Sequence, residues 1–397
     1  MLVLAMASPA HAQDDVSEDA RPMTVADALA RADEHAPEVA VAAAQAAVAQ
    51  RDVGVAGILP NPRIGAGLSV DYAAILDLYI LLPVFGQLDT ATDAARARAQ
   101  VAEDSIEVAR LDARLVVALA WTDLWLAEQN VRLAADDAER RQRVEEAAQA
   151  RLEEGAVARI DVVRARADAA RATADASAAT SATRGAAARL IGALGDDPTT
   201  TTVTTSGAPL GAEVPELDVD VVLASHPLAQ RALASTHAAE EATLHDHRSR
   251  WPRLGVQVSD WIHRSNDAHD VRLLLTMDVP LFDEPRIERS ESARDQAHVE
   301  EAAVMTRLRA AALAMRADYL AVAERCRAQE ESVIPMMREA SDLAREGYEE
   351  GSVDLTTTLA AAQALADAER AEATCLADRA RAAARLDHAE GRSDDWR

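Results

Sequence analysis

The most constraining feature of this 397-residue sequence is the stretch from Gln87 to Glu154, which contains neither glycine nor proline. These two residue types most often end or kink a helix, so the stretch predicts one continuous helix of about 100 Å at 1.5 Å per residue. Helices in globular domains average about 11–12 residues, so this one cannot be buried inside such a domain. It needs lateral partners, as in a coiled coil or a barrel of helices.

The composition favours closely packed helices. Hydrophobic residues make up 49% of the chain but aromatic residues only 3%, because alanine supplies much of the apolar fraction. The formal net charge of −26 argues against nucleic-acid binding, which needs a basic surface, and against docking to anionic lipid.

The chain repeats itself once. Four short motifs recur in the same order at separations of 190 to 197 residues, around Pro37 and Pro227, Arg63 and Arg253, Pro83 and Pro280, and Gly155 and Gly351. This order predicts a tandem duplication. The first repeat is placed at residues 24–195 and the second at 217–392. A loop-like linker joins them at 196–216, and residues 1–12, which end in Ala10-His11-Ala12, are predicted to be a truncated signal peptide.

Each repeat has the same predicted plan of a helix, a β-hairpin and a long helical hairpin. Thr24 and Asp27 form a capping signature for the first helix. The β-hairpins are placed at residues 63–83 and 253–280, and the helical hairpins turn near residues 155 and 351. The second long helix is expected to start near Arg286 and to be interrupted at Pro335.

The strands alternate between apolar and polar residues. The alternation runs through residues 64–72, 254–259 and 271–279, and residues 78–82 are more uniformly apolar, which places the first hairpin turn between Tyr72 and Leu78. Such segments suit a transmembrane β-barrel, although a small soluble sheet with one buried face gives the same pattern. A barrel in lipid can have no free edge, and four strands cannot close one. Two chains would supply eight strands and three would supply twelve, and only the wider barrel leaves an open lumen.

Several motifs resemble the TolC-like outer-membrane efflux family, especially its heavy-metal (CzcC-like) branch. They are Leu59-Pro60-Asn61-Pro62-Arg63 before the first strand, Leu82-Pro83-Val84-Phe85-Gly86 and Val279-Pro280-Leu281-Phe282 after the hairpins, and the two helical turns. The resemblance covers about residues 24–392. It implies a mainly α fold with a small β part, in which long antiparallel hairpins form an α-barrel and four strands per chain contribute to a trimeric 12-stranded outer-membrane β-barrel. It also implies a homotrimer that contacts outer-membrane lipid, extends through the periplasm and passively conducts small molecules or metal cations. Its partners would be a periplasmic adaptor protein and an inner-membrane efflux pump of the RND type.

The same resemblance suggests which residues do the work. The first tip (Glu154, Gly155, Ala156 and Val157) and the second tip (Glu350, Gly351, Ser352 and Val353) would contact the adaptor. Both glycines are equally explained by a left-handed turn. Asp161 and Asp354 follow the tips and would form rings of three carboxylates at a cation-favouring gate, or would simply cap helices.

Cysteine, histidine and tryptophan give three further predictions. Cys326 lies 25 residues before Gly351 and Cys375 lies 24 after it, so a hairpin folded there brings them to similar heights and predicts a disulfide. Six of the ten histidines fall between His226 and His269 without any metal-ligand spacing, so no metal site is predicted. Trp121 and Trp125 share a helix face and predict packing, and Trp261 at a strand end predicts a membrane-interface aromatic.

Two other classes of function remain as alternatives. A periplasmic helical adaptor or scaffold without a pore would also contain long hairpins, but the duplication argues against it. An enzyme would need a nucleophile–base pair, a phosphate loop or a metal motif, and the sequence contains none of these patterns. The sequence therefore predicts no catalytic residues and no cofactor.

Overall fold

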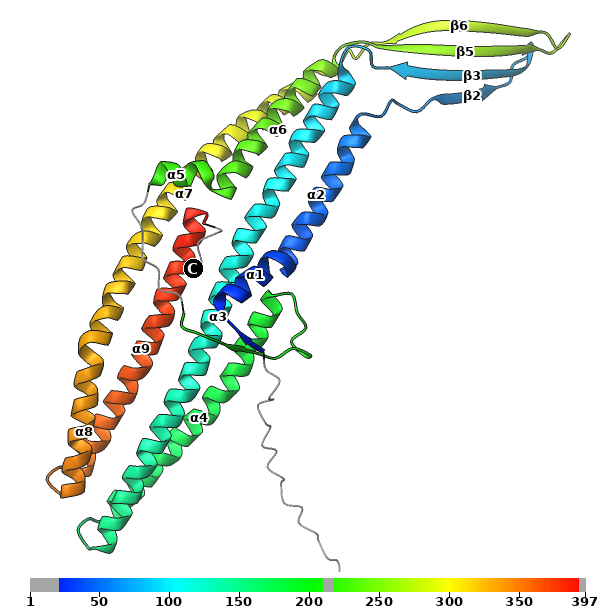
Figure 1. The fold of residues 1–397 in the computed structure, drawn as a ribbon. Coiled ribbons are helices and arrows are strands. Elements are labelled where there is room, and N and C mark those ends of the chain that lie inside the picture. Colours follow the sequence, from blue (N-terminus) through cyan, green and yellow to red (C-terminus); the bar gives the residue numbers. More distant parts are fainter. Residues whose placement is uncertain (1–20, 210–217, 393–397) are drawn as a thin grey trace, which may run out of the picture.

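The computed structural model describes residues 21–209 and 218–392, so the predicted signal peptide at 1–12 and part of the linker lie outside the described residues. The molecule is elongated. A four-stranded sheet lies at one end, and the turns of the two helical hairpins lie at the other, with long helices running between them (Figure 1).

The first half of the chain has helices and strands in the predicted order. They are α1 (Val25–His35), α2 (Pro37–Ala56), β2 (Arg63–Gly67), β3 (Tyr72–Leu82), α3 (Gln87–Glu153) and α4 (Arg159–Ala193). A capping box between Thr24 and Asp27 starts α1 as predicted. The unbroken helix α3 is 67 residues long, as the absence of glycine and proline requires.

The second half repeats this order. It contains α5 (Val219–Ser225), α6 (Pro227–Ser249), β5 (Arg253–His263), β6 (His269–Asp278), α7 (Glu284–Ala328), α8 (Ile334–Glu350) and α9 (Leu355–Glu390). A π-helical turn, Gln329–Val333, joins α7 to α8. The predicted interruption at Pro335 is wrong in detail. The wider turn comes before the proline, which sits in the first turn of α8 where its missing N–H breaks no hydrogen bond of that helix.

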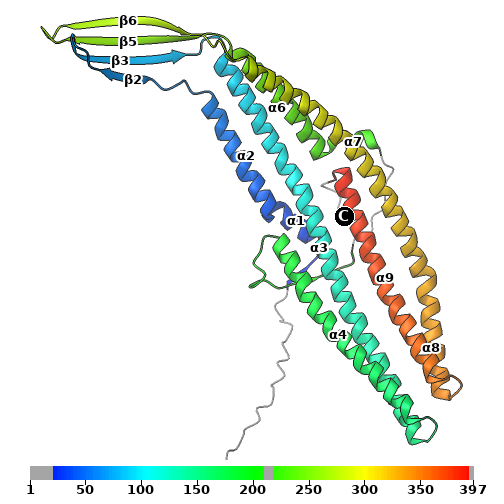
Figure 2. The same cartoon turned by 180° about the vertical axis from the view of Figure 1, so that it is seen from behind.

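The shorter helices stack end to end beside the long ones. In Figures 1 and 2, α2 continues above α4, and α6 continues above α9. Gly195, which follows α4, has a φ of +79°, and a Cβ there would lie 2.6 Å from the carbonyl oxygen of His35, the last residue of α1 before α2 begins. At the other junction, a Cβ on Gly391 would lie 3.0 Å from His226 Cδ2. The close approach at both junctions explains these two glycines.

The linker prediction is wrong in one respect, because residues 196–216 contain a strand. β4 (Val203–Thr205) pairs in parallel with β1 (Arg21–Met23), which precedes the first predicted repeat. Buried Met23 and Val203 belong to the main core, which lies at mid-height. Trp121 Nε1 donates a hydrogen bond to the Met23 carbonyl oxygen at 3.0 Å, so β1 is fixed by a side chain far away in the sequence. Trp121 and Trp125 are buried in this core, as their predicted packing role requires.

The four-stranded sheet is antiparallel, with the order β2-β3-β5-β6. Its first turn is not where the alternation placed it. β2 ends at Gly67, and Tyr72 already belongs to β3, which pairs with β5 along its whole length. Tyr72 packs against Trp261 with ring centroids 4.8 Å apart, and this contact places it in β3. Within the described ranges, no helix has both the length and the apolarity that crossing a membrane requires.

Candidate functional sites: the strand sheet and the hairpin tips

One side of the four-stranded sheet is apolar and solvent-exposed. Residues paired directly across antiparallel strands share a face, and one such row is Ile64, Leu78, Val258 and Leu273. Exposure in this single chain reaches 83% for Ile64 and 80% for Leu275. We define the apolar face by the residues Ile64, Ala66, Leu76, Leu78, Ile80, Leu82, Leu254, Val256, Val258, Asp260, Val271, Leu273, Leu275 and Met277. A soluble sheet would cover such a surface.

The opposite side carries most of the polar residues. We define this polar face by the residues Arg63, Gly65, Asp77, Tyr79, Arg253, Gly255, Gln257, Ser259, Asp270, Arg272, Thr276 and Asp278, with Ile75, Leu81, Trp261 and Leu274 among them. Asp77 accepts hydrogen bonds from Ser259 Oγ at 2.5 Å and from Gln257 Nε2 at 3.1 Å. The three arginines on this face balance its three aspartates, so the face has no formal net charge.

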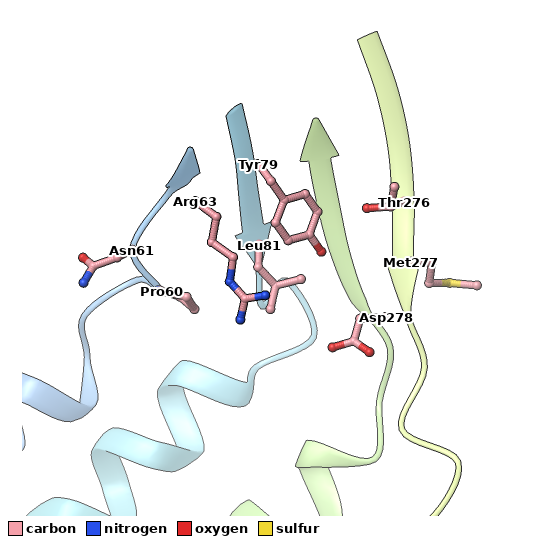
Figure 3. Close-up of a pocket in the computed structure, with 8 residues that line it drawn as sticks. All are labelled: Pro60, Asn61, Arg63, Tyr79, Leu81, Thr276, Met277 and Asp278. Atoms are coloured by element: carbon pink, nitrogen blue, oxygen red, sulfur yellow. The ribbon is translucent and has the colours of Figure 1, made fainter. Parts of the chain in front are cut away.

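The end of the polar face nearest the helices contains a groove of about 420 Å³. Figure 3 shows Arg63, Tyr79, Thr276 and Asp278 around it, with the Tyr79 hydroxyl directed toward β6. Tyr79 reaches across β5 because residue 255 is glycine. A Cβ at that position would lie 2.5 Å from Tyr79 Cε2.

Trp261 lies on the polar face rather than on the apolar one. The Arg272 guanidinium sits over its ring at 4.4 Å from the centroid, and Arg272 also pairs with Asp270 at 2.5 Å. Trp261 is therefore not part of the apolar face, and its place at a membrane interface stays a prediction. The sequence alone was enough to place this side chain, because successive residues of a strand point to opposite faces and Val258, three residues earlier, lies on the apolar face.

The two tips are built alike. Gly155 and Gly351 have φ values of +76° and +82°, so both adopt the left-handed conformation that favours glycine. Ala156 N donates to the Arg151 carbonyl oxygen at 2.8 Å, and Ser352 N donates to the Gly347 carbonyl oxygen at the same distance. Each pair spans six residues and caps the end of its helix. This capping explains the two glycines without any partner protein.

Arg151 joins the two tips. Its Nη1 donates to the Tyr348 carbonyl oxygen at 2.6 Å, and its guanidinium lies 4.8 Å from the centre of the Tyr348 ring. The pKa of the Tyr348 phenol lies above its usual value, mainly because the group is partly buried. The positive charge of Arg151 lowers this pKa, and the negative charge of Asp161 raises it. Asp161 itself lies in the first turn of α4.

Asp354 has a helix-capping role. Its carboxylate accepts hydrogen bonds from Thr357 N at 2.8 Å and from Thr357 Oγ1 at 3.2 Å, at the start of α9. These bonds stabilise the charged form, so the pKa of Asp354 lies below its usual value. The two candidate gate acids therefore differ in their surroundings.

A buried charged network above the tips was not found from the sequence. Arg141 on α3 is 4% exposed and contacts Asp137 on its own helix, Asp168 on α4 and Gln363 on α9. Arg140 pairs with Glu369 of α9 at 2.9 Å. These contacts tie the first hairpin to the second. No local pattern marked these arginines, because their partners come from distant segments.

Cys326 and Cys375 form a disulfide with a Cα–Cα distance of 5.5 Å, which joins α7 to α9 directly above the π-helical turn. Among the described residues, no group of three or more His, Cys, Asp or Glu side chains could hold a metal ion. His226 is fully buried at the junction of α6 and α9, where it serves the packing of the helices.

Residues 28–196 match the family model of the outer membrane efflux protein. Over 92–95% of the chain, the structure is also similar to solved outer-membrane proteins. This chain has the fold of an outer-membrane channel. For the outer membrane protein VceC of Vibrio cholerae the TM-score is 0.75 at 17% identity, over 92% of this chain and 96% of that one. For CusC the TM-score is 0.79 at 14% identity, over 95% of both chains, and for the CmeC outer membrane channel of Campylobacter jejuni it is 0.73 at 15%, over 94% and 87%.

These likenesses confirm the predicted fold class, in which long helical hairpins accompany a small strand sheet. The matching family consists of channels, and the prediction that the chain is not an enzyme agrees with it. No curated protein matches the sequence.

Proposed function

We propose that this chain belongs as a whole to the outer membrane efflux family and forms a homotrimeric, passive channel in a tripartite efflux system. The observation that carries the proposal is the four-stranded sheet with one apolar face, one polar face and two open edges. The apolar face suits the hydrocarbon of the outer membrane, and the polar face suits a water-filled lumen.

The sheet edges require further copies of the chain. Within the described residues, β2 and β6 each pair on one side only. Unpaired backbone groups are not tolerated in lipid, so β6 of one copy would pair with β2 of the next. Three copies close a barrel of twelve strands and leave an open lumen.

The helices support the same arrangement. α2 packs on α3, α3 on α6 and α6 on α7, so α2 and α7 are the two edges of the upper layer. One exposed apolar stripe on α2 repeats every seven residues and consists of Val41, Val48 and Val55. A second stripe on α7 has spacings that are multiples of seven and consists of Val299, Leu313 and Leu320. Each of these six side chains is more than half exposed. Such stripes pack against each other in coiled coils. The α2 stripe of one copy would cover the α7 stripe of its neighbour.

The tips are the proposed docking points for a periplasmic adaptor, which would connect the channel to an inner-membrane pump of the RND type. Support comes from their place at the end of the molecule opposite the sheet (Figure 2). Asp161 is the better candidate for a gate acid, since Asp354 is engaged in capping α9. We extend the cargo to metal cations on the strength of the sequence resemblance to the heavy-metal branch alone.

The first test is the oligomer mass and single-channel conductance of the detergent-purified protein. We expect a trimer that dissociates on heating and gives cation-selective currents in planar bilayers. The polar face of the sheet has no formal net charge, so the cation selectivity would come from the excess of acidic residues outside the sheet. A water-soluble monomer without conductance would instead favour a periplasmic adaptor or scaffold.

Two neighbouring residues of β6 give a matched pair of variants. Leu273 lies on the apolar face and is 72% exposed, and Leu274 lies on the polar face and is 41% exposed. Leu273→Arg would place a charge in lipid at a cost of about 2–4 kcal/mol and should block membrane assembly. Leu274→Arg should assemble normally. Equal behaviour of the two variants would contradict a lipid-facing sheet.

A further inference from the structure

A groove of about 470 Å³ lies where the end of α9 meets the start of α6, between α3 and α7. Its surface is mostly apolar. The apolar lining comes from Leu115 of α3, Leu228 of α6, and Val304, Leu308, Ala311 and Met315 of α7. Four segments far apart in the sequence therefore build one pocket within a single chain.

Three arginines from three different helices line this groove. They are Arg231 of α6, Arg307 of α7 and Arg385 of α9. Arg307 Nε donates to the Ala303 carbonyl oxygen of its own helix at 3.2 Å. Across residues 21–209 and 218–392, none of the three guanidinium groups has a carboxylate oxygen within 4.0 Å. Nearby Arg381, by contrast, pairs with Asp123 at 2.6 Å.

The other polar and acidic groups near the groove are engaged in contacts of their own and do not balance the charge of the three arginines. His226 Nε2 lies 3.1 Å from the His388 carbonyl oxygen, and His226 Nδ1 accepts a hydrogen bond from Leu228 N at 3.1 Å. These contacts fit a neutral ring that donates through Nε2. Asp112 is engaged by His388 Nε2 at 2.7 Å, and Glu390 pairs with Arg392.

The chain carries a formal net charge of −26, and yet three arginines without a carboxylate partner line this one mostly apolar groove. Guanidinium groups gathered in one place repel one another unless an anion lies between them. Arginine binds carboxylate and phosphate oxygens through paired N–H donors. An apolar lining removes the rest of such a ligand from water.

We infer that this groove is a binding site for a small amphipathic anion, with an acidic head group at Arg231, Arg307 and Arg385 and a short apolar body on the leucine- and methionine-lined floor. An aliphatic monocarboxylate is the simplest member of this class. The lining residues all belong to one chain, so each chain holds one ligand, whatever the number of copies in the assembly. The site is therefore independent of the proposed channel function.

The test is calorimetric titration of the full-length purified protein with sodium octanoate, in the same detergent or buffer in which its oligomer mass is measured, with the protein-free solution as the blank. We expect saturable binding of one octanoate per chain. Removing two head-group partners in the double variant Arg231→Gln/Arg385→Gln should weaken binding about tenfold or more, because two charge-assisted contacts are lost. Val304→Trp keeps all three arginines but fills the groove, and it should abolish binding.

Two controls separate this site from general effects. Arg327→Gln/Arg345→Gln removes the same charge from arginines that pair with carboxylates on α7 and α8, and it should bind octanoate like the unmodified protein. Octanol has the same apolar chain without the charge and should bind at least about tenfold more weakly. The proposal is overturned if octanoate does not saturate, if the Arg231/Arg385 variant binds as tightly as the unmodified protein, or if octanol binds as tightly as octanoate.

Discussion

Replacing Gly255 by alanine should destabilise the strand sheet, because Tyr79 occupies the space that the new methyl group would need. A Cβ at residue 255 would lie 2.3 Å from Thr276 Oγ1, 2.5 Å from Tyr79 Cε2 and 2.6 Å from the Tyr79 hydroxyl oxygen. Carbon atoms in good contact are about 3.5–4.0 Å apart, so Tyr79 has to move by about 1 Å or more. Overpacking of this kind costs about 1–3 kcal/mol.

A double-mutant cycle tests the cause. In a Tyr79→Ala background the ring is absent, and of the three atoms nearest to the new methyl group only the rotatable Thr276 hydroxyl remains. The cost of Gly255→Ala should therefore fall by about 1 kcal/mol or more in that background. The assay is the temperature at which the purified assembly loses its β-sheet circular dichroism, followed for all four members of the cycle.

Gly65→Ala is the matched control, since it lies on the same face of the same sheet. A Cβ there would lie 3.5 Å from the nearest atom, Asp77 Cβ, which is an ordinary contact. It should change the unfolding temperature little. If Gly255→Ala is as stable as the unmodified protein, or costs as much without Tyr79 as with it, the placement of Tyr79 over β5 is refuted.

Three further predictions concern the helical part. Arg141→Met should lower the free energy of unfolding by about 1–3 kcal/mol, because it leaves buried Asp137 with Arg370 alone and half-buried Asp168 without its guanidinium partner. An unchanged thermal unfolding temperature of the purified assembly would contradict this role of the network. The double variant Cys326→Ser/Cys375→Ser should have a free energy of unfolding about 4 kcal/mol lower, because the disulfide closes a loop with a sequence separation of 49. A reductant should lower the unfolding temperature of the unmodified protein but not that of this variant. Burial lowers the pKa of His226, so the unfolded chain binds a proton that the folded chain does not, and stability should fall as the pH drops below about 6.5. His226→Asn should flatten that pH dependence, and an unchanged pH profile would contradict it.

Local sequence patterns predicted the elements but not all of their limits. The glycine- and proline-free stretch fixed α3 to within a residue, and the capping pair Thr24 and Asp27 located α1. The first hairpin turn was misplaced, because Tyr72 fits the alternation of either strand. Its contact with Trp261, almost two hundred residues later, decides the matter.

The candidate sites were predictable to different degrees. Gly155 and Gly351 could be found because a helix end needs a left-handed residue, which is a local requirement. Arg141, Arg231 and Arg385 could not be found. An arginine on a helix is usually solvated, and only the packing of other helices determines whether it becomes buried or meets two more arginines.

By itself, the sequence determined the duplication, the long helices, the two-faced strands and the glycine turns, because these depend on backbone propensity and on the period of apolar residues. Only the tertiary structure decided the strand order β2-β3-β5-β6, the pairing of β1 with β4 and the end-to-end stacking of α9 and α6. These features join segments that are far apart in the chain. Their stability comes from contacts across the fold, such as Trp121 with Met23 and His226 with His388, whose partners no local window of sequence contains.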